Sequence, residues 1–245
     1  MMAKPIVSVV MSTYNQAEYL EQALDSLQAQ TIPRKDFEII VVNDGSTDGT
    51  SEILRKRNGS IRLFEEDENR LGLPASCNLG LDVAGGRYFA RVDSDDFVSP
   101  EWLERLIEPL ETETGARYAY PDRYEMQGEE RRYVPAQPGN MYSLEACGTL
   151  FRTENLRRVG GYGNFYWEEY DLYLRLGGLV PSIHVPEPLY VYRRHAASMT
   201  HKAEKRLEGW LQLCRQWGVD TLKSAGSRPD LDEAIQLMEG DETVQ

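Results

Sequence analysis

The chain has 245 residues, of which 41% are hydrophobic and 27% charged, so it is long enough for one large α/β domain or two small ones. Its formal net charge of −13 argues against nucleic acid as the main partner and against simple electrostatic docking on an anionic membrane. No apolar run approaches the ~20 residues needed to cross a bilayer, and residues 1–5 do not resemble a signal peptide. The three separated cysteines form no CxxC pair, so we expect neither disulfides nor a zinc site. Together these features lead us to expect a cytoplasmic protein.

Strands and helices alternate in the first half of the chain. Nearly continuous apolar runs predict buried strands at 6–11, 37–42, 61–64 and 87–92. Helical periodicity predicts helices over 18–30, 50–57 and 75–83, and a further helix that begins near 99–101. This alternation indicates a mainly parallel sheet with right-handed crossovers.

Polar turns follow three of these strands, at 13–15, 43–46 and 93–95. Ligands of such sheets bind outside the carboxyl ends of the strands. We therefore expect one pocket to use all three turns.

The second half is less regular. Short strands are expected near Tyr118 and Tyr133 and at 189–192, and helices at 169–176, 202–217 and 231–238. One compact domain with a variable second half and a helical tail fits this pattern, and the tail could dimerise, pack on the body or contact a membrane.

The acidic turn Asp93-Ser94-Asp95 is the most informative local feature. Side chains alternate on extended backbone, so Asp93 and Asp95 can point the same way. Two carboxylates that face each other repel, and a hard divalent cation, Mg²⁺ or Mn²⁺, relieves that repulsion. The alternative is a solvated acidic turn that caps the next helix.

Seven motifs in order resemble a family 2 glycosyltransferase with the GT-A fold. They are VSVVMSTYN at 7–15, IVVNDGSTD at 40–48, NRLGLPASCN at 69–78, ARVDSDD at 90–96, GGY at 160–162, EEYDLYLR at 168–175 and YRRHAAS at 192–198. The resemblance implies an α/β glycosyltransferase domain over 1–200, with a nucleotide-binding half at 1–112 and an acceptor-side half at 113–200, followed by a helical extension at 201–245. It also implies inverting sugar transfer from a nucleotide-diphosphate sugar to an acceptor hydroxyl in glycan or polysaccharide synthesis, on a protein that is cytoplasmic or peripheral to the inner face of the membrane.

The resemblance assigns the metal site to the acidic turn. Asp95 would bind Mn²⁺ or Mg²⁺ directly, and Asp93 would contact the ribose, or the metal through water. His195 would complete the metal shell, because a neutral imidazole is a suitable Mn²⁺ ligand. The alternative for His195 is a surface histidine beside two arginines. His184 and His201 match no motif and are interpreted as structural or solvated.

The family usually has Glu-Asp where this chain has Glu168-Glu169, with the aspartate as catalytic base. By position Glu169 would be the base, although its extra methylene moves the carboxylate, and Glu168 is the other candidate. The alternative is an exposed acidic first turn favoured by the helix dipole.

The remaining assignments concern the donor and the acceptor. Asp44 can accept a hydrogen bond from a pyrimidine ring N–H, which favours a UDP-sugar, and Tyr14 can stack on the base. Trp167 is the one residue assigned to the acceptor. The other donor-binding residues would be Thr13, Arg70, Asn78, Arg91 and Ser94.

Two rival functions remain open. A sugar-nucleotide pyrophosphorylase would carry a glycine-rich, basic phosphate loop, which the turn at 12–15 lacks. A catalytically degenerate domain that only binds nucleotide-sugar or glycan is favoured by the change of aspartate to glutamate, and the intact acidic turn weighs against it. The sugar, the acceptor, the linkage and the oligomeric state are not determined by the sequence.

Overall fold

The computed structural model describes residues 4–57, 59–66, 70–179, 181–196, 198 and 202–242. The strands are β1 (Val7–Thr13), β2 (Phe37–Asn43), β3 (Arg62–Glu65), β4 (Tyr88–Arg91), β5 (Phe97–Val98), β6 (Tyr118–Gln127), β7 (Glu130–Val134), β8 (Leu150–Arg152) and β9 (Ser182–Arg193). The helices are α1 (Leu20–Gln28), α2 (Thr50–Lys56), α3 (Leu73–Val83), α4 (Trp102–Thr112), α5 (Thr153–Arg158), α6 (Glu168–Arg175), α7 (Ala203–Trp217), α8 (Val219–Ala225) and α9 (Pro229–Glu242), with 3₁₀ turns η1 (Arg34–Asp36) and η2 (Met141–Ser143).

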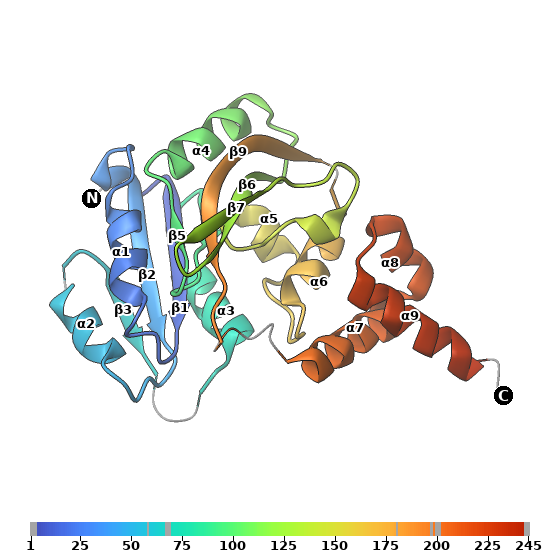
Figure 1. Cartoon of the computed structure of the whole chain (residues 1–245). Coiled ribbons are helices and arrows are strands. Elements are labelled where there is room, and N and C mark those ends of the chain that lie inside the picture. Colours follow the sequence, from blue (N-terminus) through green and yellow to red (C-terminus); the bar gives the residue numbers. More distant parts are fainter. Residues whose placement is uncertain are drawn as a thin grey trace.

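All these strands belong to one mixed sheet, in the order β3-β2-β1-β4-β8-β6-β9-β5, with β7 paired to β6. The first four strands in that order are parallel, whereas β8 is antiparallel to both of its neighbours. Beyond it, β6 and β9 are parallel to each other (Figure 1). The predicted α/β class, with a parallel first half and a mixed second half, is confirmed.

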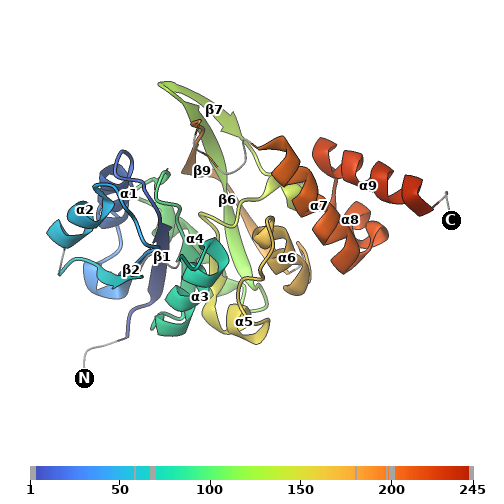
Figure 2. The ribbon, with the colours of Figure 1, turned by 90° about the horizontal axis from the view of Figure 1, so that it is seen from below.

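Helices cover both faces of the sheet, because the central strands are apolar on both sides. Val9 of β1 faces the cluster formed by α1, α2 and α4, and its neighbour Val10 faces the opposite cluster, which α3, α5 and α6 cover (Figure 2). Gly80 of α3 lies so close to β1 that an added Cβ would stand 2.4 Å from Val10 Cγ1. A larger residue there would push α3 off the sheet.

The C-terminal helices pack on the body through α6. Trp210 of α7 is fully buried, and its ring stacks on that of Tyr170 with a centroid distance of 5.3 Å and an interplanar angle of 13°. Of the three roles considered for the tail, packing on the body is the one that the structure shows. The boundary at residue 200 stays a prediction.

Most predicted elements are present, with ends displaced by a few residues. Four short elements were missed, β5, β8, α5 and α8, and β9 begins seven residues before the expected strand at 189–192. Strands of two or three residues carry too little alternation to be recognised. In the described part of the chain, no helix has the length and apolarity that a bilayer crossing requires.

Candidate active site

The carboxyl ends of β1, β2 and β4 meet at one edge of the sheet, as the topology predicted. Thr13 at the end of β1 is in register with Asn43 at the end of β2, and Arg91 at the end of β4 is level with Val10. The polar segments that follow these three strands therefore share that edge.

The acidic segment after β4 is a turn, which the N–H of Asp96 closes by donating to the carbonyl of Asp93 at 3.1 Å. The predicted turn at 93–95 is therefore present, and the side-chain alternation of extended backbone does not apply within it. The two carboxylates bind different partners, since Asp93 pairs with Arg91 and Asp95 pairs with His195. Ser94 is buried within the turn.

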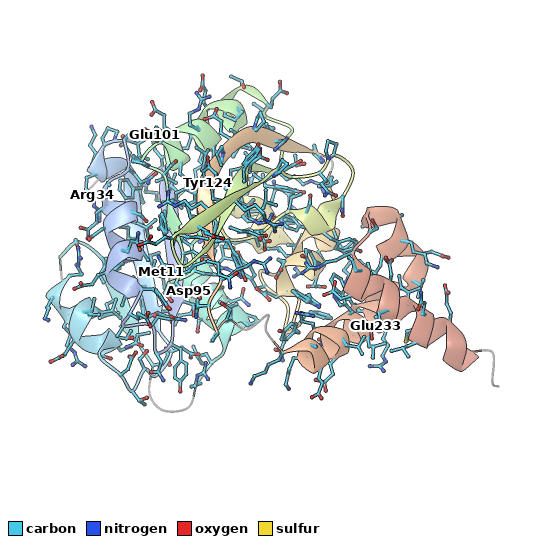
Figure 3. The ribbon with its side chains drawn as sticks, in the orientation of Figure 1. Met11, Arg34, Asp95, Glu101, Tyr124 and Glu233 are labelled. Atoms are coloured by element: carbon cyan, nitrogen blue, oxygen red, sulfur yellow. The ribbon has the colours of Figure 1, made fainter. Side chains whose placement is uncertain are left out.

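Asp95 and His195 lie in direct contact although they are separated by 100 positions. His195 Nε2 is 2.8 Å from Asp95 Oδ2, and the imidazole packs on the Tyr19 ring at 4.7 Å. The antiparallel pairing of β5 with β9 brings the two together, because β5 follows the acidic turn and His195 follows β9 (Asp95 is labelled in Figure 3). Burial and the nearby Asp93 raise the pKa of Asp95. A carboxylate and an imidazole in contact form a donor set that suits Mn²⁺.

Asp96 supports this turn, a role that the sequence did not reveal. Its side chain is buried and accepts hydrogen bonds from Tyr190 Oη at 2.6 Å and from the N–H of Arg193 at 2.7 Å. Ligand atoms of Asp96, Asp93 and Cys147 lie within 4.8 Å of one another. Burial raises the pKa of the Cys147 thiol well above its usual range. The cluster of Asp93, Asp96 and Cys147 therefore does not suit a hard cation.

Arg91 connects the acidic turn to α6. Its Nε is 2.8 Å from Asp93 Oδ1, and its Nη1 donates to Glu168 Oε1 at 2.6 Å. Burial alone would lower the pKa of Arg91, but Asp93 and Glu168 outweigh burial and raise it. Asp93 and Glu168 therefore both bind the Arg91 guanidinium, and the assignment of Arg91 to donor binding stays a prediction.

Glu169, the next residue, has a different environment. In the described residues it makes no ion pair, and it lines a cavity of about 490 Å³. Burial, and then the adjacent Glu168, raises the pKa of Glu169 well above its ordinary value. The two glutamates are therefore distinct: one is neutralised by Arg91 and the other borders open space.

Trp167 lines the same cavity but is only 3% exposed. Its Nε1 donates to the carbonyl of Arg206 at 3.1 Å, and its ring packs on Tyr166, Tyr170 and Trp210. Much of the Trp167 side chain therefore packs against α7. Its assignment to the acceptor stays a prediction.

The residues expected to bind the nucleotide gather beyond β1 and β2. The Arg70 guanidinium lies 3.4 Å above the Tyr14 ring, and its Nε is 3.6 Å from Asp44 Oδ2. Asp44 also accepts from the N–H groups of Leu71 at 2.6 Å and Gly72 at 3.1 Å. Among the described residues, Thr13 Oγ1 is buried and has no hydrogen-bond partner. The Arg70 guanidinium therefore covers one face of the Tyr14 ring.

Asn78 has a role that differs from the one expected. Its amide donates to the carbonyl of Tyr162 and accepts from the N–H of the same residue, both at 2.8 Å. Both ends of the amide hold the Gly160-Gly161-Tyr162 loop, and the assignment of Asn78 to donor binding stays a prediction.

Of the two histidines expected to have no part in the site, His184 is paired with Asp122 at 2.7 Å and stacks on Tyr120. The structural interpretation of His184 is therefore confirmed. His201 lies outside the described residues.

Comparisons with known proteins show what the chain is similar to in sequence and in fold. The family model described as Glycosyl transferase family 2 matches residues 8–170. The uncharacterized glycosyltransferase EpsJ of Bacillus subtilis is 36% identical over 157 residues, which cover 61% of this chain and 41% of EpsJ. The matched stretches span between 21% and 41% of the length of EpsJ and three other curated glycosyltransferases.

Two solved structures share the fold at low sequence identity. The S. aureus TarS fragment 1–349 in complex with UDP-GlcNAc has a TM-score of 0.68 and 19% identity, covering 85% of this chain and 66% of that one. The mannosyltransferase PcManGT from Pyrobaculum calidifontis, in complex with GDP-Man and Mn²⁺, has a TM-score of 0.62 and 19% identity, covering 99% and 81%.

Proposed function

We propose a reaction for this chain from the premise that it belongs to glycosyltransferase family 2 and is a glycosyltransferase. The proposed reaction transfers a sugar from a UDP-sugar to an acceptor hydroxyl, with inversion and with a divalent cation. The observation that carries it is the connected series of side chains from His195 and Asp95, past Asp93 and Arg91, to Glu168, next to Glu169.

Asp95 and His195 would hold Mn²⁺ or Mg²⁺, with Asp93 beside them. The cation would stabilise the negative charge that develops on the leaving diphosphate. Arg91 keeps Asp93 in place, and Asp96 holds the turn against β9 through Tyr190 and the backbone of Arg193. The chain thus presents a preorganised acidic turn and needs little rearrangement to bind the donor.

Glu169 would be the base. The acceptor oxygen forms a bond with the anomeric carbon while the bond from that carbon to the phosphate oxygen breaks. The acceptor proton passes to Glu169, and the nucleoside diphosphate leaves with the electron pair. A raised pKa makes Glu169 a stronger base than an ordinary glutamate, and its position on the cavity gives the acceptor access to it. Glu168 is the weaker candidate because Arg91 already binds its carboxylate.

The nucleotide would lie over Thr13, Tyr14, Asp44 and Arg70. TarS and PcManGT were solved with UDP-GlcNAc and GDP-Man, so the shared fold accommodates such donors. A carboxylate has about four lone-pair sites, which leaves Asp44 able to accept from a uracil ring N–H in addition to its two backbone donors. We further propose that the enzyme acts in glycan or polysaccharide synthesis, in the cytoplasm or at the inner face of the membrane.

The test is nucleotide release from UDP-glucose, UDP-GlcNAc and GDP-mannose, each with Mn²⁺ and with EDTA. The proposal predicts release from a UDP-sugar that requires the metal and is lost in Glu169→Gln, with Glu168→Gln as the neighbouring comparison. Release that persists undiminished in Glu169→Gln excludes this base. If sugar nucleotides bind without any release, the catalytically degenerate interpretation holds instead.

A further inference from the structure

The cavity beside Glu169 is unusually rich in arginine for this chain. The whole sequence carries a net charge of −13, yet the cavity lining has more arginines than glutamates. Its charged residues are Arg123, Arg194, Arg206, Arg228, Glu125, Glu145 and Glu169. An acidic protein that gathers cations around one cavity favours an anionic ligand there.

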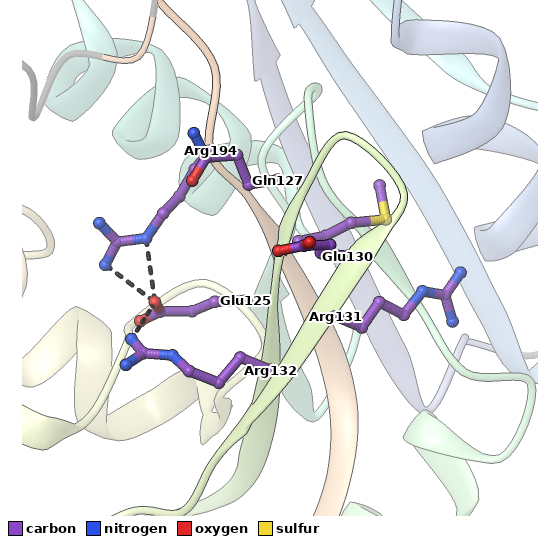
Figure 4. A pocket seen from close by; sticks show the side chains of 7 residues that line it. Glu125, Gln127, Glu130, Arg131, Arg132 and Arg194 are labelled. Carbon is purple, nitrogen blue, oxygen red and sulfur yellow. Dashed lines mark hydrogen bonds and ion pairs between the residues drawn. The ribbon is translucent and has the colours of Figure 1, made fainter.

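Glu125 does not cancel this charge, because three arginines share its carboxylate. Arg194 Nε donates to Oε2 at 2.9 Å and Arg132 Nη2 donates to the same oxygen at 2.7 Å, while Arg123 Nη2 donates to Oε1 at 3.1 Å. Burial alone would raise the pKa of Glu125, but the bonds from Arg194 and Arg132 outweigh it and lower the pKa to about 2. Figure 4 shows Arg194 and Arg132 pointing to Glu125, whereas Arg131 of the same strand points away. The group is therefore positive at any physiological pH.

These arginines keep unused donors. In the part of the chain that the structure describes, Arg194 makes no hydrogen bond through Nη1, and its side chain is 51% exposed. Arg123 Nε is buried and has no partner. A guanidinium has five N–H donors, so Arg194 can bind a ligand without giving up Glu125.

The C-terminal extension supplies a further cation. Arg228 lies in the α8–α9 connection, and its guanidinium lies 4.9 Å from the Trp167 ring centroid and 5.8 Å from that of Trp210. Its Nε donates to Asp230 at 3.0 Å and its Nη1 donates to Tyr170 Oη, while no described residue accepts from Nη2. The aromatic rings hold the guanidinium in one place, so it is ordered before a ligand arrives.

The connection that carries Arg228 is fixed to the body. Asn140 Nδ2 donates to the carbonyl of Ser227 at 3.1 Å. Gly226 has a φ of +142°, and an added Cβ would stand 2.2 Å from Asn140 Oδ1. Arg228 is therefore a fixed part of the cavity wall.

We propose that this cavity is the acceptor site and that it selects an acceptor with a phosphate ester group, which Arg194 and Arg228 bind. The inference rests on the proposed function, because the hydroxyl of that acceptor would be the group that Glu169 deprotonates. The guanidinium of Arg194, which follows β9, and that of Arg228 in the extension reach the cavity from separate segments. This suits the several oxygens of a phosphate better than the two of a carboxylate.

The test measures binding without a sugar donor, using the intrinsic fluorescence of Trp167, which lines the cavity, and of Trp210, which packs on Trp167. The probe is glycerol 1-phosphate, with glycerol as its neutral match and glucuronate as a carboxylate. We expect saturable binding of glycerol 1-phosphate alone. Arg194→Gln and Arg228→Gln should each weaken it by about 10-fold or more, because each removes a charged hydrogen-bond donor. Arg131→Gln is the matched control on β7 and should bind like the parent protein.

Arg228→Gln could also unfold the extension, so Arg194→Gln, whose side chain is half exposed, provides an independent test. Sedimentation with phosphatidylglycerol vesicles, compared with phosphatidylcholine vesicles, identifies the source of the phosphate. Selective co-sedimentation that Arg194→Gln abolishes indicates a lipid headgroup. Binding of glycerol 1-phosphate without co-sedimentation indicates a soluble or polymeric phosphate ester. Both results support the site.

Equal binding of glycerol and glycerol 1-phosphate, tighter binding of glucuronate, or an equal loss in Arg131→Gln would overturn the inference. The failure of the proposed function looks different. In that case no sugar nucleotide is turned over, while glycerol 1-phosphate still binds and still depends on Arg194. Transfer to a phosphate-bearing acceptor at an unchanged rate in Arg194→Gln and Arg228→Gln would leave the proposed function standing and remove the phosphate site.

Discussion

Replacing Arg91 with methionine tests the bridge between the acidic turn and α6. Arg91 and Glu168 have side chains that are 5% and 4% exposed, so the substitution leaves a buried carboxylate without its cation. Removing one partner of a buried ion pair costs about 3–5 kcal/mol, and we expect a loss in this range at neutral pH. Asp93, whose side chain is 25% exposed, adds little because water can solvate it.

The loss should depend on pH. Burial raises the pKa of the Glu168 carboxyl, and Arg91 draws it back down. In Arg91→Met the folded state therefore holds a proton on Glu168 that the unfolded chain releases. Stability consequently falls as the pH rises above the pKa of the unfolded glutamate. We expect the difference from the parent protein to be small near pH 5 and large near pH 8.

Urea unfolding at both pH values, followed by circular dichroism, measures this difference. Arg87→Met is the matched control, because Arg87 precedes the same strand and pairs with Glu111 on the surface, with side chains 56% and 42% exposed. The control should change stability by less than about 1 kcal/mol. The double variant Arg91→Met/Glu168→Gln should recover most of the loss. A loss below about 1 kcal/mol in Arg91→Met, or one that is equal at both pH values, would refute the buried-pair reasoning.

Three further outcomes follow from the site. Glu169→Gln should lower kcat by about 10²–10⁴-fold with little change in the Kd of the donor. In the parent protein, the acid limb of the kcat–pH profile should lie at a higher pH than an ordinary glutamate would give, because the raised pKa keeps Glu169 protonated at low pH. An acid limb near pH 4 in the parent protein would contradict this. Asp95→Asn and His195→Ala should each weaken Mn²⁺ binding by at least about 10-fold in calorimetry, and unchanged affinity would exclude that residue as a ligand. Gly161→Ala should destabilise the fold by about 1–3 kcal/mol in thermal unfolding, because the φ of Gly161 is +71° and the added Cβ meets Asn78 Oδ1. Gly160→Ala is the control: its added Cβ meets no atom within 4 Å, so it reports the backbone strain of a positive φ without the clash.

The sequence indicated the first half of this fold better than the second half. The runs at β1 and β2 are apolar on both faces because both faces are covered, so period and length together identify them as parallel strands. The contact between Asp95 and His195 depends on the pairing of β5 with β9 across almost 100 residues. Only the family resemblance connected these two residues, because nothing in the local pattern around a two-residue strand does.

The environment of Glu169 depends on contacts that no local sequence pattern encodes. Arg228 follows an ordinary turn, and its position over Trp167 arises from the packing of α7 and α9 on α6. The pairing of Arg91 with Glu168 likewise joins residues 77 positions apart. The different environments of Glu168 and Glu169 follow from that pairing, so the sequence left the choice of base open.

Anomalous diffraction at the manganese edge, from crystals grown with Mn²⁺ and UDP, tests the central claim most directly. We expect one strong peak with Asp95 Oδ2 and His195 Nε2 as ligands, next to the diphosphate, and we expect the peak to disappear in Asp95→Asn. A peak at the group formed by Asp93, Asp96 and Cys147, or UDP bound at this edge of the sheet with no metal beside it, would exclude the proposed metal site.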